Sequence, residues 1–337
     1  MTNPVLVEVT RGPLVESRHR GAIAVYDETG AAVFELGDVS SPVYPRSAIK
    51  ALQAIRLVES GGADAFGLSP RQLAVICSSH NGEPAQVETV QSILQAAGLT
   101  GADLECGPQW PKLDVDIARL NKAVSAPSAV HNNCSGKHSG MLALARHLGH
   151  KTAGYIAPDH PVQLEIRGVL QDMTQSSLSA ETCGSDGCSV PTYAAPLSAM
   201  ARGFATFVSG NGLRAVRADA CRRLLHAVMD EPHMVAGTGR FCTQLMTTLS
   251  GKVFVKTGAE GVFCGAIPGL NLGIAIKCDD GATRAAEIIM ANVLSRLLKD
   301  DARALIKPFQ IAKVENRNAW HVGDVRPVDR AFDAISH

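Results

Sequence analysis

The stretch Tyr44-Pro45-Arg46-Ser47-Ala48-Ile49-Lys50 sets a serine and a lysine three residues apart, where a loop turns into a helix. Apolar residues continue at helical spacing as far as Val58, and Gly61-Gly62 ends the run. Ser47 and Lys50 are therefore neighbours on one helix face. A serine hydroxyl needs a base within hydrogen-bond reach to become a nucleophile, and a lysine kept uncharged by burial can supply it. This stretch predicts a serine-lysine catalytic pair, although a helix-start serine beside a solvated lysine has the same pattern.

Strands are expected on both sides of this helical region. The first fifty residues alternate like strands around the turn Asp27-Glu28-Thr29-Gly30, and apolar runs split by glycines return near the end of the chain. We expect an α/β (α+β) fold in which an antiparallel sheet from both termini, flanked by helices, carries an inserted helical domain. Residues 1–45 and 246–337 would form the sheet domain and 46–245 the helical insert, with the active site in the cleft between them.

The individual elements follow from hydrophobic periodicity and turn residues. The expected strands are Val5 to Val9, Glu16 to Tyr26, Ala31 to Leu36, Lys252 to Thr257, Val262 to Ile267 and Leu272 to Cys278. The expected helices after the first are Pro70 to Ile76, Glu83 to Ala97, Asp114 to Val124, Ser139 to Leu148, Pro161 to Thr174, Pro196 to Val208, Val216 to Met229 and Thr283 to Leu298.

Composition narrows the class of partner. Lysine plus arginine equals aspartate plus glutamate at 32 each in 337 residues, which argues against nucleic acid or an anionic membrane and favours a small, roughly neutral partner. Residues 1–20 hold no uninterrupted apolar core of a signal peptide, so we expect a cytoplasmic protein. The nine cysteines are then better interpreted as thiols than as disulfides, and some of them as metal ligands.

Two later motifs fit the same chemistry as the serine-lysine pair. Ser79-His80-Asn81 has the form Ser-x-Asn on a loop, and Lys256-Thr257-Gly258 ends a strand. Each has a plain alternative, since the first could cap the following helix and the second could be a solvated strand edge. Together with Ser-x-x-Lys, they stand in the order found in penicillin-recognising serine hydrolases. The chain thus resembles the serine β-lactamase and penicillin-binding superfamily, including serine-dependent glutaminases.

Four stretches carry a closer resemblance: Tyr44 to Lys50, Cys77-Ser78-Ser79-His80-Asn81-Gly82-Glu83, His131 to Met141, and Cys183 to Pro191. Through them the chain resembles, over essentially its whole length, the asparaginase family typified by the rhizobial inducible and constitutive enzymes. The resemblance implies hydrolysis of L-asparagine to L-aspartate and ammonia, two serine-lysine pairs in one site, a nearby zinc site and a homodimer. Matched by motif, the implied pairs are Ser47 with Lys50 and Ser79 with Lys256, and the implied zinc ligands are Cys134, Lys137 and Cys188.

The residues around the implied metal site leave the ligand set open. Two thiolates, one further donor and a water would satisfy four-coordinate zinc. The alternative is a set of buried reduced thiols, because no C-x-x-C or His-x3-His spacing is present. A lysine ligand must first lose a proton, and spacing alone favours His138 over Lys137.

The mechanism we expect is acyl transfer at an amide. Ser47 would attack the carboxamide while Lys50 accepts its proton, and Ser79 with Lys256 would relay a proton to the leaving ammonia. Which serine is the nucleophile stays open, since Ser79 also has a lysine. Four residues are expected to hold the α-amino and α-carboxylate groups of the substrate: Arg46, Asn81, His138 and Asp186. The glycine-rich stretch 236–240 is a candidate lining of the cleft and is too short for a phosphate cradle.

Three other functions fit parts of the pattern. A glutaminase differs by one methylene in the substrate pocket. A β-lactamase or transpeptidase shares all three short motifs. A catalytically inactive zinc-binding protein would keep the cysteine loops without using the serines. In that case a Ser47→Ala variant would behave like the parent, and the metal would dominate stability.

Overall fold

The computed structural model describes residues 2–124 and 126–335, and the chain divides into two compact units. The sheet unit comprises Met1–Ala48, Ala195–Ser209 and Leu245–His337. The helical unit comprises Ile49–Ala194 and Gly210–Gln244. This division differs from the expected one in the middle of the chain, where Ala195–Ser209 belongs with the sheet.

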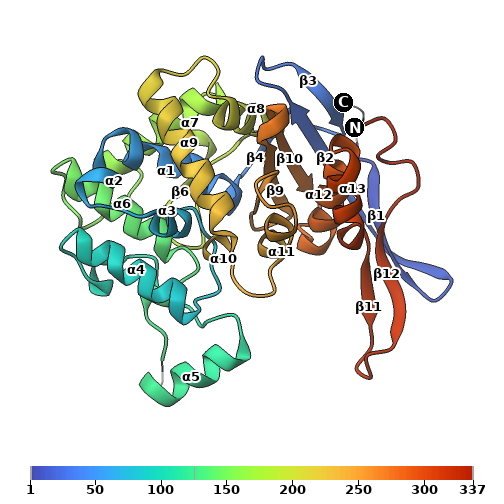
Figure 1. The fold of residues 1–337 in the computed structure, drawn as a ribbon, viewed down its shortest axis with the longest axis horizontal. Helices are drawn as coiled ribbons and strands as arrows, with labels where there is room; N and C mark the ends of the chain where they lie inside the picture. Colours follow the sequence, from blue (N-terminus) through green and yellow to red (C-terminus); the bar gives the residue numbers. More distant parts are fainter. Residues whose placement is uncertain (1, 125, 336–337) are drawn as a thin grey trace. The chain divides into compact units, whose positions relative to one another are not determined.

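The sheet unit is built on one eight-stranded antiparallel sheet. Its strand order is β11-β12-β1-β2-β10-β9-β8, with β3 paired to β2. In Figure 1 the blue strands of the N-terminal region lie among the orange and red strands of the C-terminal region. The predicted mixed fold, with a sheet from both termini and an inserted helical part, is therefore confirmed. The strands of this sheet are β1 Val5–Arg11, β2 Leu14–Tyr26, β3 Ala32–Leu36, β8 Phe254–Thr257, β9 Val262–Ile267, β10 Leu272–Cys278, β11 Ala312–Glu315 and β12 His321–Pro327.

Helices cover the central strands, which are buried along their length. Gly273 in β10 permits a close approach of helix α8 (Leu197–Ser209), because a Cβ there would lie 2.0 Å from the Ala201 carbonyl oxygen. Gly265 in the adjacent strand β9 instead faces Met290 of helix α12 (Thr283–Leu297). This packing explains why α8 belongs to the sheet unit. The remaining elements of the unit are β4 Pro42–Val43, β7 Ala195–Pro196, η5 Pro268–Leu270, α13 Asp300–Ile306 and η6 Lys307–Phe309. The short helix η1 (Arg46–Ile49) crosses from this unit into the helical unit at its last residue.

The helical unit is organised around α6 (Ser135–His147), whose residues from Ser135 to Ala145 are all buried. Two glycines one turn apart bring α6 against α3 (Pro70–Ile76): a Cβ at Gly136 would lie 2.0 Å from the Val75 carbonyl oxygen, and one at Gly140 would lie 2.7 Å from Ile76. This close crossing sets the start of α6 beside the loop that follows α3.

The other elements of the helical unit are short or surround α6. They are α1 Lys50–Glu59, α2 Gly62–Ala65, α4 Pro84–Ala96, η2 Gly101–Asp103, α5 Asp114–Val124, η3 Ala129–His131, α7 Pro161–Thr174, η4 Ala180–Thr182, β5 Cys183–Ser185, β6 Pro191–Tyr193, α9 Ala215–Asp230 and α10 Pro232–Val235. Helix α11 (Phe241–Thr248) crosses the boundary between the two units. No helix in the described part of the chain has both the length and the apolar character needed to span a bilayer.

Most of the expected elements are present within one or two residues, but two predictions were wrong or incomplete. Helix α6 begins at Ser135 instead of Ser139, because a helix buried on all sides shows no apolar stripe from which its start can be located. The segment after Leu298 received no prediction, yet it supplies α13, β11 and β12, and β12 pairs with β1.

Candidate active site

The loop after α3 carries Ser79, and its hydroxyl lies against a buried lysine. Lys50, the first residue of α1, has no exposed surface. Its ammonium donates to Ser79 Oγ at 3.0 Å, to Cys134 Sγ at 3.1 Å and to the Ser78 carbonyl oxygen. A lysine ammonium has three N–H donors, and these three acceptors account for all of them. The geometry therefore joins Lys50 to Ser79 within the helical unit.

This contact is not one of the expected pairs. The motif resemblance joins Lys50 to Ser47 and Ser79 to Lys256, and the described bond joins Lys50 to Ser79. Ser47 and Lys256 belong to the sheet unit, so both expected pairs and the convergence of all four side chains stay predictions.

Within the sheet unit, the end of β8 lies against the turn that carries Ser47. A Cβ at Gly258 would lie 3.0 Å from the Pro45 carbonyl oxygen and 3.1 Å from the Ala48 amide nitrogen. Lys256 is 1% exposed, and its ammonium donates to the Thr257 carbonyl oxygen at 2.8 Å. The Lys-Thr-Gly and Ser-x-x-Lys motifs thus meet through Gly258, which explains why a glycine stands at this position.

Asn81 and Glu83 form a second part of the Ser79 loop. Glu83 caps α4, and its carboxylate accepts hydrogen bonds from Asn81 Nδ2 at 2.9 Å and from the Thr238 amide at 2.7 Å and hydroxyl at 2.8 Å. Burial tends to raise the pKa of Glu83, but the bonds from Thr238 and Asn81 outweigh burial and lower it. The Asn81 NH2 group therefore holds the loop, whereas the Asn81 Oδ1 atom accepts from Arg240 Nη1 at 3.3 Å.

Two histidines near this loop are buried and occupied. His80 Nδ1 accepts a bond from the Gly82 amide, and its Nε2 lies 2.9 Å from Ser135 Oγ. Burial lowers the pKa of His80 to about 3, with the Lys50 charge adding to the effect, so His80 is a neutral structural group near pH 7. His138, expected to bind substrate, has no exposed surface and lies 2.6 Å from Tyr155 Oη through Nδ1. Its Nε2 has no hydrogen-bond partner among the described residues.

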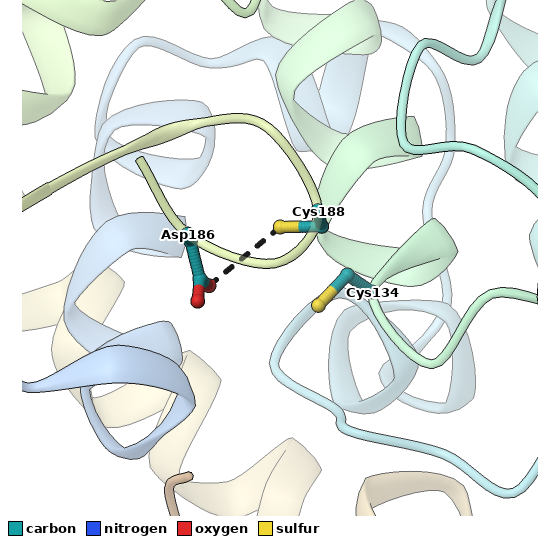
Figure 2. Close-up of side chains that lie close together, drawn as sticks. All are labelled: Cys134, Asp186 and Cys188. Carbon is teal, nitrogen blue, oxygen red and sulfur yellow. Dashed lines mark hydrogen bonds between the residues drawn. The ribbon is translucent and has the colours of Figure 1, made fainter. Parts of the chain in front are cut away.

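Three potential metal ligands gather at the start of α6. The ligand atoms of Cys134, Asp186 and Cys188 lie within 4.8 Å of one another (Figure 2). Lys137 borders this cluster, with its ammonium 3.1 Å from Cys188 Sγ and 3.7 Å from the Asp186 carboxylate. Thus the three residues that the resemblance implies as zinc ligands lie together, and Asp186 joins them.

Metal binding requires deprotonated ligands, so the pKa shifts within this cluster bear on whether it suits a metal. The hydrogen bond from Cys188 lowers the pKa of the Cys134 thiol; burial opposes this shift, and the ammonium groups of Lys50 and Lys137 add to it. That same bond, together with burial, raises the pKa of Cys188. Burial tends to lower the pKa of Lys137, but the surrounding sulfurs and Asp186 raise it.

Two sulfurs and a carboxylate are donors that zinc accepts, and around a tetrahedral zinc such donors lie roughly 3.5 Å apart. The cluster of Cys134, Asp186 and Cys188 therefore fits the ion after a small contraction. Lys137 fits as a ligand only after its ammonium loses a proton.

Prediction from sequence missed Arg240 and the way in which Glu83 holds the segment that carries it. From sequence, Glu83 was interpreted only as an acidic residue near the first turn of a helix, and segment 236–240 only as a candidate lining of the cleft. The signal in the sequence was the glycine at position 237, which has a φ of 108° that other residues rarely adopt.

Comparison with known families bears directly on these motifs. A family model described as L-asparaginase II matches residues 7–327, nearly the whole chain. The chain belongs to the L-asparaginase II family. This confirms the family that the motifs indicated, and membership indicates a hydrolase that acts on amides. No match is found among the curated proteins.

Solved structures give more distant likenesses. The protein Mglu, in its tris and glutamate form, is 16% identical with a TM-score of 0.46; the match covers 91% of this chain and 63% of Mglu. A β-lactamase from Mycobacterium bovis is 13% identical with a TM-score of 0.40, over 78% of this chain and 88% of that one. A D-alanine carboxypeptidase from Burkholderia cenocepacia is 13% identical with a TM-score of 0.38, over 86% and 93%. These likenesses are too low to support an argument about mechanism.

Proposed function

We propose that this protein is an L-asparaginase that hydrolyses L-asparagine to L-aspartate and ammonia through a serine ester. Membership of the L-asparaginase II family supports the class of substrate. The observation that carries the chemistry is the 3.0 Å contact between the buried Lys50 amine and Ser79 Oγ. A serine beside a buried amine is a recurring nucleophile for acyl transfer.

In the proposed reaction, the uncharged form of the Lys50 amine accepts the Ser79 proton as Ser79 Oγ attacks the side-chain amide carbon. The carbon–nitrogen bond then breaks, and the proton leaves with ammonia. Water hydrolyses the resulting β-aspartyl ester and releases aspartate. The backbone carbonyl of Ser78 holds the amine in place, so the base is positioned before substrate binds.

Zinc fits the neighbouring cluster, and Cys134, Asp186 and Cys188 would hold it, with Lys137 as the ligand that the family resemblance implies. A bound zinc ion supplies a Lewis acid that can polarise a carbonyl oxygen. The residues of the chain itself keep the site dry, since Lys50, Cys134 and Lys137 are each less than 5% exposed. A dry site strengthens the interactions that orient the substrate.

The first experiment measures ammonia release from L-asparagine and from L-glutamine. We expect the parent protein to prefer asparagine, and Ser79→Ala and Lys50→Met to lose about 10²- to 10⁴-fold in kcat. Turnover of nitrocefin without turnover of asparagine would refute the proposal. So would full activity in both variants.

The nucleophile is assigned by mass spectrometry. A diazoketone analogue of asparagine should add once to the intact protein, and peptide mapping should place the adduct on Ser79. An adduct on Ser47 would refute this assignment and support the one expected from sequence, in which Lys50 activates Ser47. An adduct on neither serine would exclude both.

A further inference from the structure

Arg240 lies beside the Ser79 loop with much of its hydrogen-bonding capacity unused. Arg240 is half-buried, and its Nη1 donates to Asn81 Oδ1 at 3.3 Å and to the Ser79 carbonyl oxygen at 3.5 Å. Both bonds are longer than ordinary N–H···O bonds. In the part of the chain that the structure describes, Nε and Nη2 have no hydrogen-bond partner, and the guanidinium has no carboxylate partner.

The segment that carries Arg240 is fixed to the Ser79 loop. The amide and the hydroxyl of Thr238 both donate to the Glu83 carboxylate, and the Thr238 carbonyl oxygen accepts a bond from Asn81 Nδ2 at 3.0 Å. Gly237 lies so close to Glu83 that a Cβ there would be 2.5 Å from the carboxylate. The Thr243 hydroxyl closes the segment by donating to the Gly237 carbonyl oxygen at 2.7 Å. Arg240 is therefore presented from a rigid support.

The nearest carboxylate in this network is not available to Arg240. Glu83 accepts its bonds from Asn81 and Thr238, and His233 Nε2 lies 3.1 Å from its second oxygen. An arginine usually pairs with a carboxylate through two parallel bonds, and a guanidinium with two free nitrogens is arranged for such a partner. The guanidinium therefore has two nitrogens available to a carboxylate from outside the chain.

We propose that Arg240 binds the α-carboxylate of the substrate and so selects amides of amino-dicarboxylic acids. The proposal rests on the proposed asparaginase function. In asparagine, three carbon–carbon bonds of about 1.5 Å separate the carboxylate carbon from the amide carbon. When the amide carbon of asparagine lies at Ser79 Oγ, the α-carboxylate of the same molecule therefore lies within a few bond lengths of Ser79. Arg240 contacts the backbone of that serine.

The test compares asparagine with 3-aminopropanamide, which is asparagine without its α-carboxylate. We expect Arg240→Ala to raise KM for asparagine about 10- to 100-fold, with a smaller change in kcat. The parent should prefer asparagine to the analogue, and the variant should not. Arg240→Lys should keep part of the preference, and millimolar guanidinium should partly restore the alanine variant.

A matched control is Arg222→Ala, because Arg222 lies in the same unit, is exposed and pairs with Asp219 one turn away. This variant should behave like the parent. An equal loss on both substrates in Arg240→Ala, without rescue by guanidinium, would show that Arg240 only braces the loop and would overturn the proposal.

A second readout separates this proposal from the proposed function. Calorimetric binding of L-aspartate to the parent should weaken at least tenfold in Arg240→Ala. If the parent fails to hydrolyse asparagine yet shows this loss of aspartate binding, the asparaginase function fails and the carboxylate site stands. If aspartate binds both proteins equally, the carboxylate site is refuted whatever the activity.

Discussion

Replacing Glu83 with glutamine tests the support under the Ser79 loop. Glu83 is 8% exposed, and its carboxylate accepts three hydrogen bonds between 2.7 and 2.9 Å from Asn81 and Thr238. Glutamine has the same shape, but one oxygen becomes an NH2 group that donates. The Thr238 hydroxyl can turn to accept from that NH2 group, so the three contacts keep their geometry but no longer involve a charged carboxylate.

The expected loss follows from the missing charge. A hydrogen bond to a charged group contributes about 1.5–3 kcal/mol and one to a neutral group about 0.5–1.5 kcal/mol, and three bonds change from the first kind to the second. We therefore expect the free energy of unfolding at pH 7 to fall by about 1.5–3 kcal/mol. For a domain of this size the corresponding fall in Tm is roughly 3–12 °C.

The sign of the pH dependence provides an internal check. The folded protein lowers the pKa of Glu83, so its carboxylate stabilises the fold above the ordinary titration range of glutamate. That stabilisation disappears as the pH falls below this range. The difference between parent and Glu83→Gln should therefore shrink in acid.

The assay is urea unfolding followed by circular dichroism across a pH series. Glu88→Gln is the control, since Glu88 is exposed on the same helix and should match the parent within about 0.5 kcal/mol. Equal stability of Glu83→Gln and parent at pH 7 would contradict the argument. A difference that stays constant in acid would show that the charge of Glu83 is not its cause.

Three further predictions concern packing and the metal. In the same urea assay, Gly136→Ala should lower the free energy of unfolding by about 3 kcal/mol, because its Cβ would meet the Val75 carbonyl oxygen. Gly168→Ala in α7, which has open space around it, should raise the free energy of unfolding by up to about 1 kcal/mol. Gly258→Ala should reduce kcat about tenfold by displacing the turn that leads into Lys50, the proposed base. Gly269→Ala, which meets no neighbour, should leave ammonia release unchanged, and equal kinetics in the two variants would contradict this reasoning. Metal analysis after dialysis should show that Cys188→Ser binds zinc at least tenfold more weakly than the parent. Cys221→Ser, which replaces a buried thiol in α9, should bind zinc like the parent. Retention of zinc by Cys188→Ser would remove Cys188 from the ligand set.

The extent of prediction differs between the sheet and the buried helix α6. Strands β9 and β10 were predicted residue for residue, because apolar runs bounded by glycine turns suit a sheet covered on both faces. The start of α6 was misplaced, since Ser135, Lys137 and His138 are polar residues buried at its first turns. The C-terminal strands β11 and β12 were missed because their side chains are largely exposed and their pairing partner β1 lies at the other end of the chain.

By itself, the sequence determined the family and the mixed fold and supplied the candidate site residues, because short motifs, helical spacing and glycine turns are local properties of the chain. Only the tertiary structure decided which groups touch. It joined Lys50 to Ser79, placed Asp186 beside Cys134 and Cys188, and used Glu83 to hold the segment of Arg240. These contacts join residues far apart in the chain, and their directions depend on how closely glycines such as Gly136 and Gly237 let the backbone approach, which no local pattern encodes.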